Sequence, residues 1–321
     1  MSRVCWIGWT GPEMDEMASG VYCLDPNPHF IVLGSGSKHN LAKHHLPLHV
    51  RDYPLSLDDA FFAIECAKPD VLIYNDYAYS AGHRPEIKES FPGAGRITED
   101  PRWGKLSAFK ILHDGESFTQ EAYYRGIATR FDALMTYNAG ALGFHKRSAL
   151  LGPAVSEAFL DEPYRPKTRD VCFTGSCMNV GHRREIAKAI EYFRPWSVFP
   201  GAYDGLGFPE YRALLMDSKY AICTFSCANG QLHPIHPKKK HLEAVLCYAF
   251  PVVEKEAGHL VPDWIPRVEF SGPEDLTRQL SWYLEQPDGW LGKNLTDARE
   301  QIIDENLYEH EYGRAFKRLG L

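Results

Sequence analysis

Three lysines and a glutamate lie close together in the C-terminal half of the chain, and they could bind a phosphate and a sugar. Lys238, Lys239 and Lys240 follow a proline-broken loop, and Glu243 comes one helical turn later. Apolar residues at helical spacing predict a helix over residues 239–249. Cations at a helix start oppose its dipole, so these lysines are better explained if an anion binds the free N–H groups. Glu243 could then accept hydrogen bonds from a ribose diol, although an exposed helix start with an ordinary Lys239–Glu243 pair fits the pattern equally well.

Acidic side chains and a histidine follow two expected strands of the N-terminal half. Asp76 comes after the apolar run at 71–74, and His113 and Asp114 come after the run at 108–112. In open α/β sheets, ligands bind beyond the carboxyl ends of the strands, where a carboxylate or an imidazole can take a proton from a hydroxyl group. Asp76, His113 and Asp114 are therefore our candidate catalytic residues. The alternative for both aspartates is the capping of a turn or a helix.

The histidines that precede and follow the three lysines do not predict a metal site. His233, His236 and His241 match no standard zinc spacing, and no cysteine pair completes a ligand set. The eight cysteines include no Cys-x-x-Cys pair, and several lie inside apolar runs, so we expect buried, reduced thiols. We predict that the protein requires neither a metal nor another cofactor.

Alternating strand-like and helix-like runs indicate two successive domains, each with a parallel α/β fold. In the N-terminal half, we expect strands at residues 3–7, 30–33, 71–74, 108–112 and 133–136, with helices at 57–67 and 119–129. The pattern restarts with strands at 170–174, 196–199, 220–225 and 251–253, and with helices at 183–193, 239–249, 273–284, 296–304 and 308–319. Strands that alternate with helices form parallel sheets covered on both faces.

A polar stretch with two prolines, residues 160–169, is typical of a linker between domains. We therefore expect an N-terminal Rossmann-like domain over 1–163 and a C-terminal one over 164–305, followed by a last helix within 306–321. Two such domains would face a central cleft. In that arrangement, ligands would meet the loops that follow strands.

Composition and charge indicate which kinds of partner, such as nucleic acid or membrane, are expected. The chain has 321 residues, a formal net charge of -7 and 24% charged residues, as expected of a folded protein of about two domains. A mildly acidic chain does not favour nucleic acid as a partner but leaves room for a local basic groove. Residues 1–14 lack the pattern of a signal peptide, and no apolar run reaches about 18 residues. We expect no membrane span and a cytoplasmic location.

One segment resembles the donor-site signature of GT-B glycosyltransferases, and more closely that of the group including the spore maturation protein CgeB and related group 1 transferases. It reads Lys240-x-x-Glu243-Ala244-x-x-Cys247-x-x-x-Pro251-Val252-Val253. Residues 131–136, 170–176 and 274–284 resemble other stretches of the same group. The likeness covers most of residues 70–321, and it informs fold and donor class but not the acceptor.

The resemblance implies that a sugar moves from a nucleoside diphosphate sugar to an acceptor hydroxyl on a glycan, a protein, a small molecule or a modified nucleic-acid base. Glu243 would hold the ribose of the nucleotide, and Lys240 would meet the diphosphate. The last helix would pack back on the N-terminal domain, which would take the acceptor. The donor-binding residues expected on this basis are Gly175, Ser176, Arg183, His236, Lys239, Lys240 and Glu243.

The sequence departs from the family pattern at two positions. Tyr248 stands where the family usually has glycine, and Ile235 stands where many retaining members carry a glutamate. His233 or His236 would then contact the sugar, and the stereochemical outcome stays open. Two other functions fit parts of the pattern: a non-catalytic nucleotide- or sugar-binding module of the same fold, and a periplasmic-type small-molecule binder. The missing signal peptide and the lysine–glutamate motif argue against the second.

Overall fold

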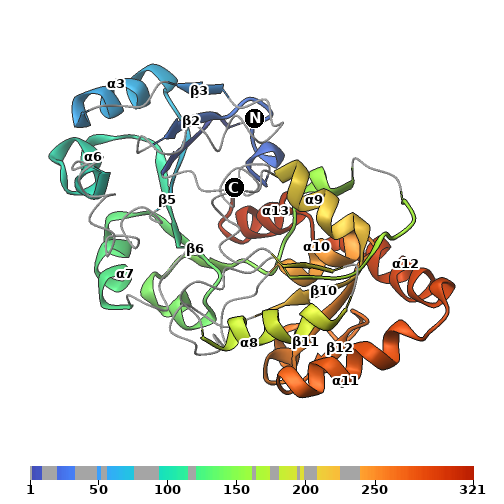
Figure 1. The fold of residues 1–321 in the computed structure, drawn as a ribbon. Helices are drawn as coiled ribbons and strands as arrows, with labels where there is room; N and C mark the ends of the chain where they lie inside the picture. Colours follow the sequence, from blue (N-terminus) through green and yellow to red (C-terminus); the bar gives the residue numbers. More distant parts are fainter. Residues whose placement is uncertain are drawn as a thin grey trace. The chain divides into compact units, whose positions relative to one another are not determined.

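The computed structural model shows the secondary structure and the sheets of most of the chain (Figure 1). The residues that it describes are 2–8, 20–32, 49–51, 56–75, 94–114, 121–160, 164–173, 181–193, 196–198, 208–224 and 239–321. They form two compact units. The first unit is made of Met1–Gly152 and Tyr308–Leu321, and the second of Pro153–Leu307.

The division between the units comes earlier in the chain than the linker expected at 160–169. It falls between Gly152 and Pro153. Packing explains this position, because Val155 and Phe159 are already buried in the core of the second unit. Val155 also pairs with Leu307 in a parallel bridge, which joins the beginning and the end of that unit.

A parallel sheet of seven strands forms the centre of the first unit. Its order is β3-β2-β1-β4-β5-β6-β7, and each neighbouring pair is parallel. The strands are β1 (Val4–Gly8), β2 (His29–Val32), β3 (His49–Arg51), β4 (Val71–Asn75), β5 (Phe109–Asp114), β6 (Ala133–Thr136) and β7 (Ser148–Leu150). β1 and β4 are buried along their whole length, as expected of a parallel sheet covered on both faces. Strand order reverses between β1 and β4, which is the Rossmann arrangement.

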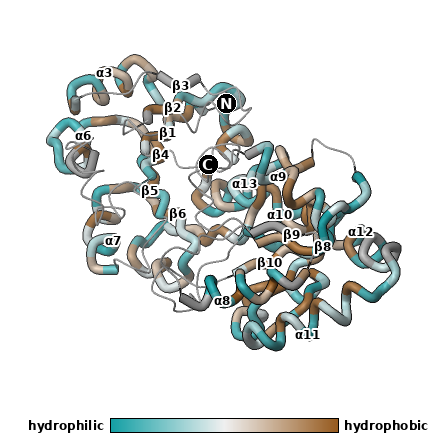
Figure 2. The backbone as a smooth tube through the Cα atoms, in the orientation of Figure 1, coloured by the Kyte–Doolittle hydropathy of each residue, from teal (hydrophilic) through white to brown (hydrophobic). Residues whose placement is uncertain are grey.

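Helices cover both faces of this sheet. α3 (Leu57–Ala67), α6 (Pro101–Lys105) and α7 (Glu121–Ile127) share one apolar core with alternate residues of the strands, among them Leu112. The next residue, His113, points to the opposite face. There it meets Tyr312 of α13 (Tyr308–Arg318), so the C-terminal helix is part of the first unit. Figure 2 shows the apolar residues concentrated along the strands, with mixed colouring on helices such as α3.

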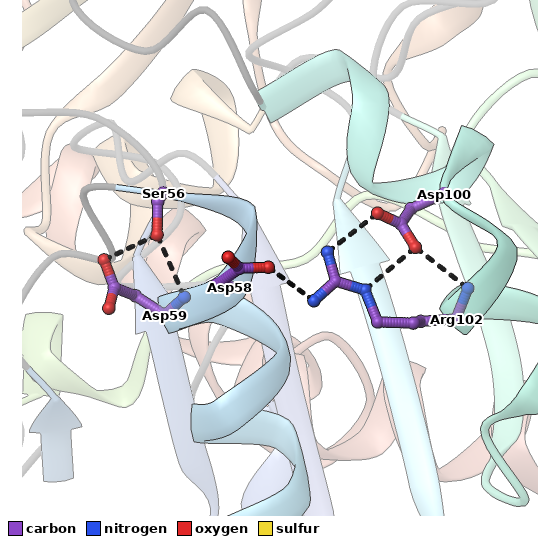
Figure 3. Close-up of polar contacts among 5 residues, drawn as sticks. All are labelled: Ser56, Asp58, Asp59, Asp100 and Arg102. Atoms are coloured by element: carbon purple, nitrogen blue, oxygen red, sulfur yellow. Dashed lines mark hydrogen bonds and ion pairs between the residues drawn. The ribbon is translucent and has the colours of Figure 1, made fainter.

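Surface charges join α3 to α6 (Figure 3). Ser56 caps α3 by accepting a hydrogen bond from the backbone N–H of Asp59, which satisfies one free donor of the first turn. Arg102 in α6 donates to Asp58 of α3 at 2.6 Å and to Asp100 at 2.8 Å. The hydrogen bonds that Asp100 accepts from the guanidinium and the backbone N–H of Arg102 hold the pKa of its carboxyl down at about 2.

The second unit contains a parallel sheet of five strands in the order β12-β11-β10-β8-β9. Its strands are β8 (Arg169–Phe173), β9 (Trp196–Val198), β10 (Ser218–Cys223), β11 (Phe250–Glu254) and β12 (Val268–Phe270). Its helices are α8 (Gly181–Ala189), α9 (Phe208–Asp217), α10 (Lys240–Leu246), α11 (Pro273–Leu284) and α12 (Asp288–Glu305). The strand order reverses between β8 and β10; counted from the first strand of the unit it is 2-1-3-4-5, the second common order of doubly wound Rossmann-like sheets.

A single lysine links the carboxyl ends of α9 and α10. Lys167 Nζ donates to the carbonyl oxygens of Met216 and Cys247, both at 2.7 Å. A cation at this end of a helix is favourable because the last carbonyl groups carry partial negative charge. Burial lowers the pKa of Lys167 to about 8.

Tyr248 ends α10 in the backbone conformation that glycine usually adopts. Its φ is 57°, its N–H bonds the carbonyl of Val245, and the next N–H, of Ala249, bonds the carbonyl of Ala244. These two bonds define a Schellman motif. The ring of Tyr248 packs edge-on against Tyr164, and the residue adopts a left-handed backbone that is unfavourable for a side chain with a Cβ.

Gly8, at the end of β1, has a packing role that the sequence pattern does not reveal. A Cβ at this position would lie 2.7 Å from the backbone oxygen of Asn75, in the neighbouring strand β4.

We predict that Gly8→Ala lowers the free energy of unfolding of the first unit by about 1–3 kcal/mol, as overpacking does, measured by urea denaturation. Gly126→Ala is the matched control, because its Cβ would meet nothing within 4 Å, and a helical alanine should be neutral or stabilising. Equal effects of the two changes would contradict this role.

Candidate functional site

Glu243 lies in the first turn of α10 and is held there by two side chains. Its own side chain is only 3% exposed. Tyr211 of α9 donates its hydroxyl to Oε2 at 2.5 Å, and Lys239 Nζ lies 3.5 Å from Oε1. A buried polar group is costly unless it is paired in this way. We call Tyr211, Lys239 and Glu243 the Glu243 cluster.

Lys240, the first residue of α10, lies beside the central strand β10. Its side chain is half-buried. Burial raises the pKa of the Cys223 thiol, and the positive charge of Lys240 acts in the opposite direction. Cys223 is the last residue of β10, so the charge of Lys240 is felt at the carboxyl end of this strand.

The other predicted donor-binding residues are placed only in part. Arg183 lies in α8 and is half-buried. Four predicted site residues lie outside the described part of the chain: Asp76, Gly175, Ser176 and His236. Of the predicted donor-binding set, the structure therefore brings Lys239 and Glu243 into direct contact and places Lys240 next to them along α10.

His113, in β5 of the first unit, is enclosed. It is 0% exposed. Nε2 lies 2.7 Å from the hydroxyl of Tyr312, and Nδ1 lies 3.1 Å from the side-chain amide of Asn75. The ring stacks on Tyr312 and lies 5.2 Å from the ring of Trp6. Burial lowers the pKa of His113 to about 3, so the imidazole is neutral at physiological pH and ties α13 to the sheet.

Asp114, the last residue of β5, is buried as well. Thr136 of β6 donates its hydroxyl to Asp114 Oδ2 at 2.6 Å. The same hydroxyl oxygen accepts a hydrogen bond from the backbone N–H of Asn138 at 2.9 Å. This arrangement orients the carboxylate at the carboxyl end of two neighbouring strands. A catalytic role of His113 or Asp114 stays a prediction.

Two residues at the carboxyl side of the second sheet were not found by sequence reasoning. Tyr211 belongs to a helix that the periodicity did not predict. Thr224 directly follows β10, is 2% exposed, and its hydroxyl has no hydrogen-bond partner among the described residues. Buried hydroxyl groups are nearly always paired, and the residues that follow Thr224 in the chain, 225–238, lie outside the described part. No signal in the sequence pointed to it, because the strand predicted over 220–225 includes this residue.

Metal-binding and membrane-spanning features are absent from the described part of the chain. Within it, no group of three or more His, Cys, Asp or Glu side chains is arranged to hold a metal ion. No helix among these residues is long and apolar enough to cross a bilayer.

Comparison with solved structures finds proteins of the same fold. HepE from Anabaena, in complex with UDP-glucose, gives a TM-score of 0.61 at 12% identity, with 100% of both chains covered. The glycosyltransferase AviGT4 of avilamycin A biosynthesis gives 0.55 at 10% identity, covering 100% of this chain and 97% of its own. A UDP-forming α,α-trehalose-phosphate synthase from Burkholderia xenovorans gives 0.54 at 10%, covering 100% and 99%.

These likenesses establish the fold. The chain is an α/β protein of two Rossmann-like units, the fold class of GT-B glycosyltransferases. No family model matches the chain, and no curated protein matches it in sequence. The closer likeness to the CgeB group therefore stays a prediction.

The buried imidazole of His113 makes stability depend on pH. The folded state keeps it neutral down to about pH 3, whereas an unfolded chain takes up the proton near pH 6.5. Between these values the unfolded state binds more protons, so stability falls as the pH is lowered, by up to about 1.4 kcal/mol per pH unit.

We predict that His113→Gln lowers the free energy of unfolding at pH 7 but makes this free energy depend less on pH between 6.5 and 4, measured by urea denaturation.

The control is His310→Gln, which removes a half-buried imidazole from the same helix, α13. It should keep the pH dependence of the wild type. An unchanged slope in His113→Gln would show that this histidine does not govern acid unfolding. His241 in the second unit is also fully buried, and burial lowers its pKa to about 3, so part of the acid sensitivity should persist in either variant.

Proposed function

We propose that this protein is a glycosyltransferase that moves a sugar from a nucleoside diphosphate sugar to an acceptor hydroxyl. The observation that carries the proposal is the Glu243 cluster, a buried carboxylate beside lysines in the first turn of α10. It lies within a Rossmann-like unit of a chain whose fold is shared with a UDP-glucose complex and with a glycosyltransferase. The resemblance of residues 240–253 to a donor-site signature supports the same reading.

In this proposal each residue of α10 has a separate task. Glu243 accepts hydrogen bonds from the ribose diol, and Lys240 and Lys239 lie near the diphosphate. Negative charge grows on the leaving nucleoside diphosphate during transfer, and fixed cations stabilise it most when they are shielded from water. Both lysines are partly buried, which strengthens their effect. Positive side chains would supply this stabilisation without a metal ion.

The remaining roles rest on the sequence. Gly175, Ser176, Arg183 and His236 would complete the donor site. Among the candidate bases, His113 fits a structural role better, because both ring nitrogens are engaged and its pKa is about 3. Asp76 and Asp114 then stay the candidates for taking the proton of the acceptor hydroxyl. We also propose membership of the CgeB-like group and a cytoplasmic location, and we leave the acceptor open.

Donor binding can be measured directly. Thermal unfolding with UDP, GDP and ADP, and with their glucose conjugates, should single out one nucleotide, since a ligand at 100 times its Kd stabilises by about 2.7 kcal/mol. Turnover of the matching sugar nucleotide with acceptor mixtures would then separate an enzyme from a non-catalytic binding module. Absence of stabilisation by every nucleotide would refute the proposal.

We predict that Glu243→Gln and Lys240→Ala weaken binding of that nucleotide at least about tenfold, because a hydrogen bond to a charged group contributes about 1.5–3 kcal/mol. Isothermal titration calorimetry measures the affinity, and unchanged thermal unfolding without ligand shows that the fold is retained. The Lys240→Ala effect should shrink at high salt, as for a partly exposed charge. Glu285→Gln removes an exposed carboxylate of the same unit and should leave the affinity unchanged. Wild-type affinity in both α10 variants would remove the donor site.

A further inference from the structure

Tyr211 makes the shortest polar contact of the Glu243 cluster, although no sequence motif points to it. It lies in α9, 32 positions before Glu243 along the chain, and its hydroxyl donates to Oε2 at 2.5 Å. Its ring packs edge-on against Phe159, with the ring centroids 6.2 Å apart. The ring is therefore anchored in the core of the unit, while the hydroxyl reaches the carboxylate.

The two oxygens of Glu243 are held unequally. The contact from the Tyr211 hydroxyl to Oε2 lies within hydrogen-bond distance. The contact of Lys239 with Oε1 is 3.5 Å, longer than the usual length of an N–H···O hydrogen bond. Oε2 is thus fixed by a rigid aromatic side chain, whereas Oε1 is paired only loosely, with a flexible one.

We infer that Tyr211 is a positioning residue that orients Glu243 so that Oε1 accepts the ribose hydroxyls of a nucleoside diphosphate. The inference rests on the proposed function and adds a determinant of selectivity for ribose over deoxyribose. An incoming hydroxyl can join or replace the loose contact with Lys239 without breaking the bond to Tyr211. Removing the phenolic hydroxyl frees the carboxylate to rotate, and the preference for the ribose diol is lost.

The test compares each ribonucleotide with its 2′-deoxy counterpart. Calorimetry on the full chain uses UDP and dUDP, or the GDP or ADP pair where that nucleotide binds. The wild type should prefer the ribonucleotide by about tenfold, the effect of one hydrogen bond to a charged group. Tyr211→Phe should reduce this ratio to about twofold, through weaker binding of the ribonucleotide with little change for the deoxy form.

Tyr220→Phe is the matched control. Tyr220 lies in β10 of the same unit, and its hydroxyl donates to the backbone oxygen of Tyr283 at 3.0 Å. The control loses a tyrosine hydrogen bond of the same unit without touching Glu243, and it should keep the wild-type ratio. In a Glu243→Gln background, Tyr211→Phe should add little, because the two changes remove one coupled contact.

Three outcomes would overturn the inference. Equal losses for the ribo and deoxy forms in Tyr211→Phe would show that the tyrosine only supports the fold. A rise in ribonucleotide affinity would show that its hydroxyl competes with the ligand. Wild-type protein that binds no nucleoside diphosphate would end the proposed function and this inference with it, whereas the first two outcomes leave the proposed function standing.

Discussion

The constraint on which the second unit depends is the placement of a carboxylate where almost no water reaches it. Glu243 is tolerated in the first turn of α10 because Tyr211 and Lys239 take up its two oxygens. The same pair of helices is joined at the other end by Lys167, which donates to the last carbonyl groups of α9 and α10. Polar contacts therefore join α9 and α10 at both ends, and they hold the two helices that carry Tyr211 and Glu243.

The first unit also buries polar side chains, but the ones that meet at His113 are uncharged. His113 is buried beside Asn75 of the neighbouring strand β4. Its Nδ1 contacts the side-chain amide of Asn75, and its Nε2 contacts the hydroxyl of Tyr312 in α13. Because the imidazole is uncharged, the network needs no counter-ion. The network attaches the C-terminal helix α13 to β5, although the two lie far apart in the sequence. A polar residue at a strand end can thus serve the fold even where its place in the topology resembles that of a catalytic group.

The sequence predicted the parts of the structure that local patterns determine. Long apolar runs identified strands such as β1, β4 and β10, and the repeat of the α/β pattern predicted two Rossmann-like units. Three of the four three-residue strands in the described part were missed, β3, β7 and β12, because so few residues seldom show an alternation; β9, equally short, was predicted. The bond from Tyr211 to Glu243 spans 32 positions, and no local period encodes it. Glu243 was found through a motif, whereas its partner required the tertiary structure.

The charged groups of the Glu243 cluster are not explained by their contribution to the stability of the fold. A buried ion pair contributes little to stability, because desolvation offsets most of the attraction, and well-packed apolar side chains of similar volume are often as stable. The fold is also compatible with many reactions, so it cannot by itself explain why charges are present here. Around the cluster, α10 also buries the apolar side chains of Leu242, Val245 and Leu246. A carboxylate, a phenol and an amine retained within such surroundings are costly as packing, but they are the groups needed to recognise hydroxyls beside a phosphate.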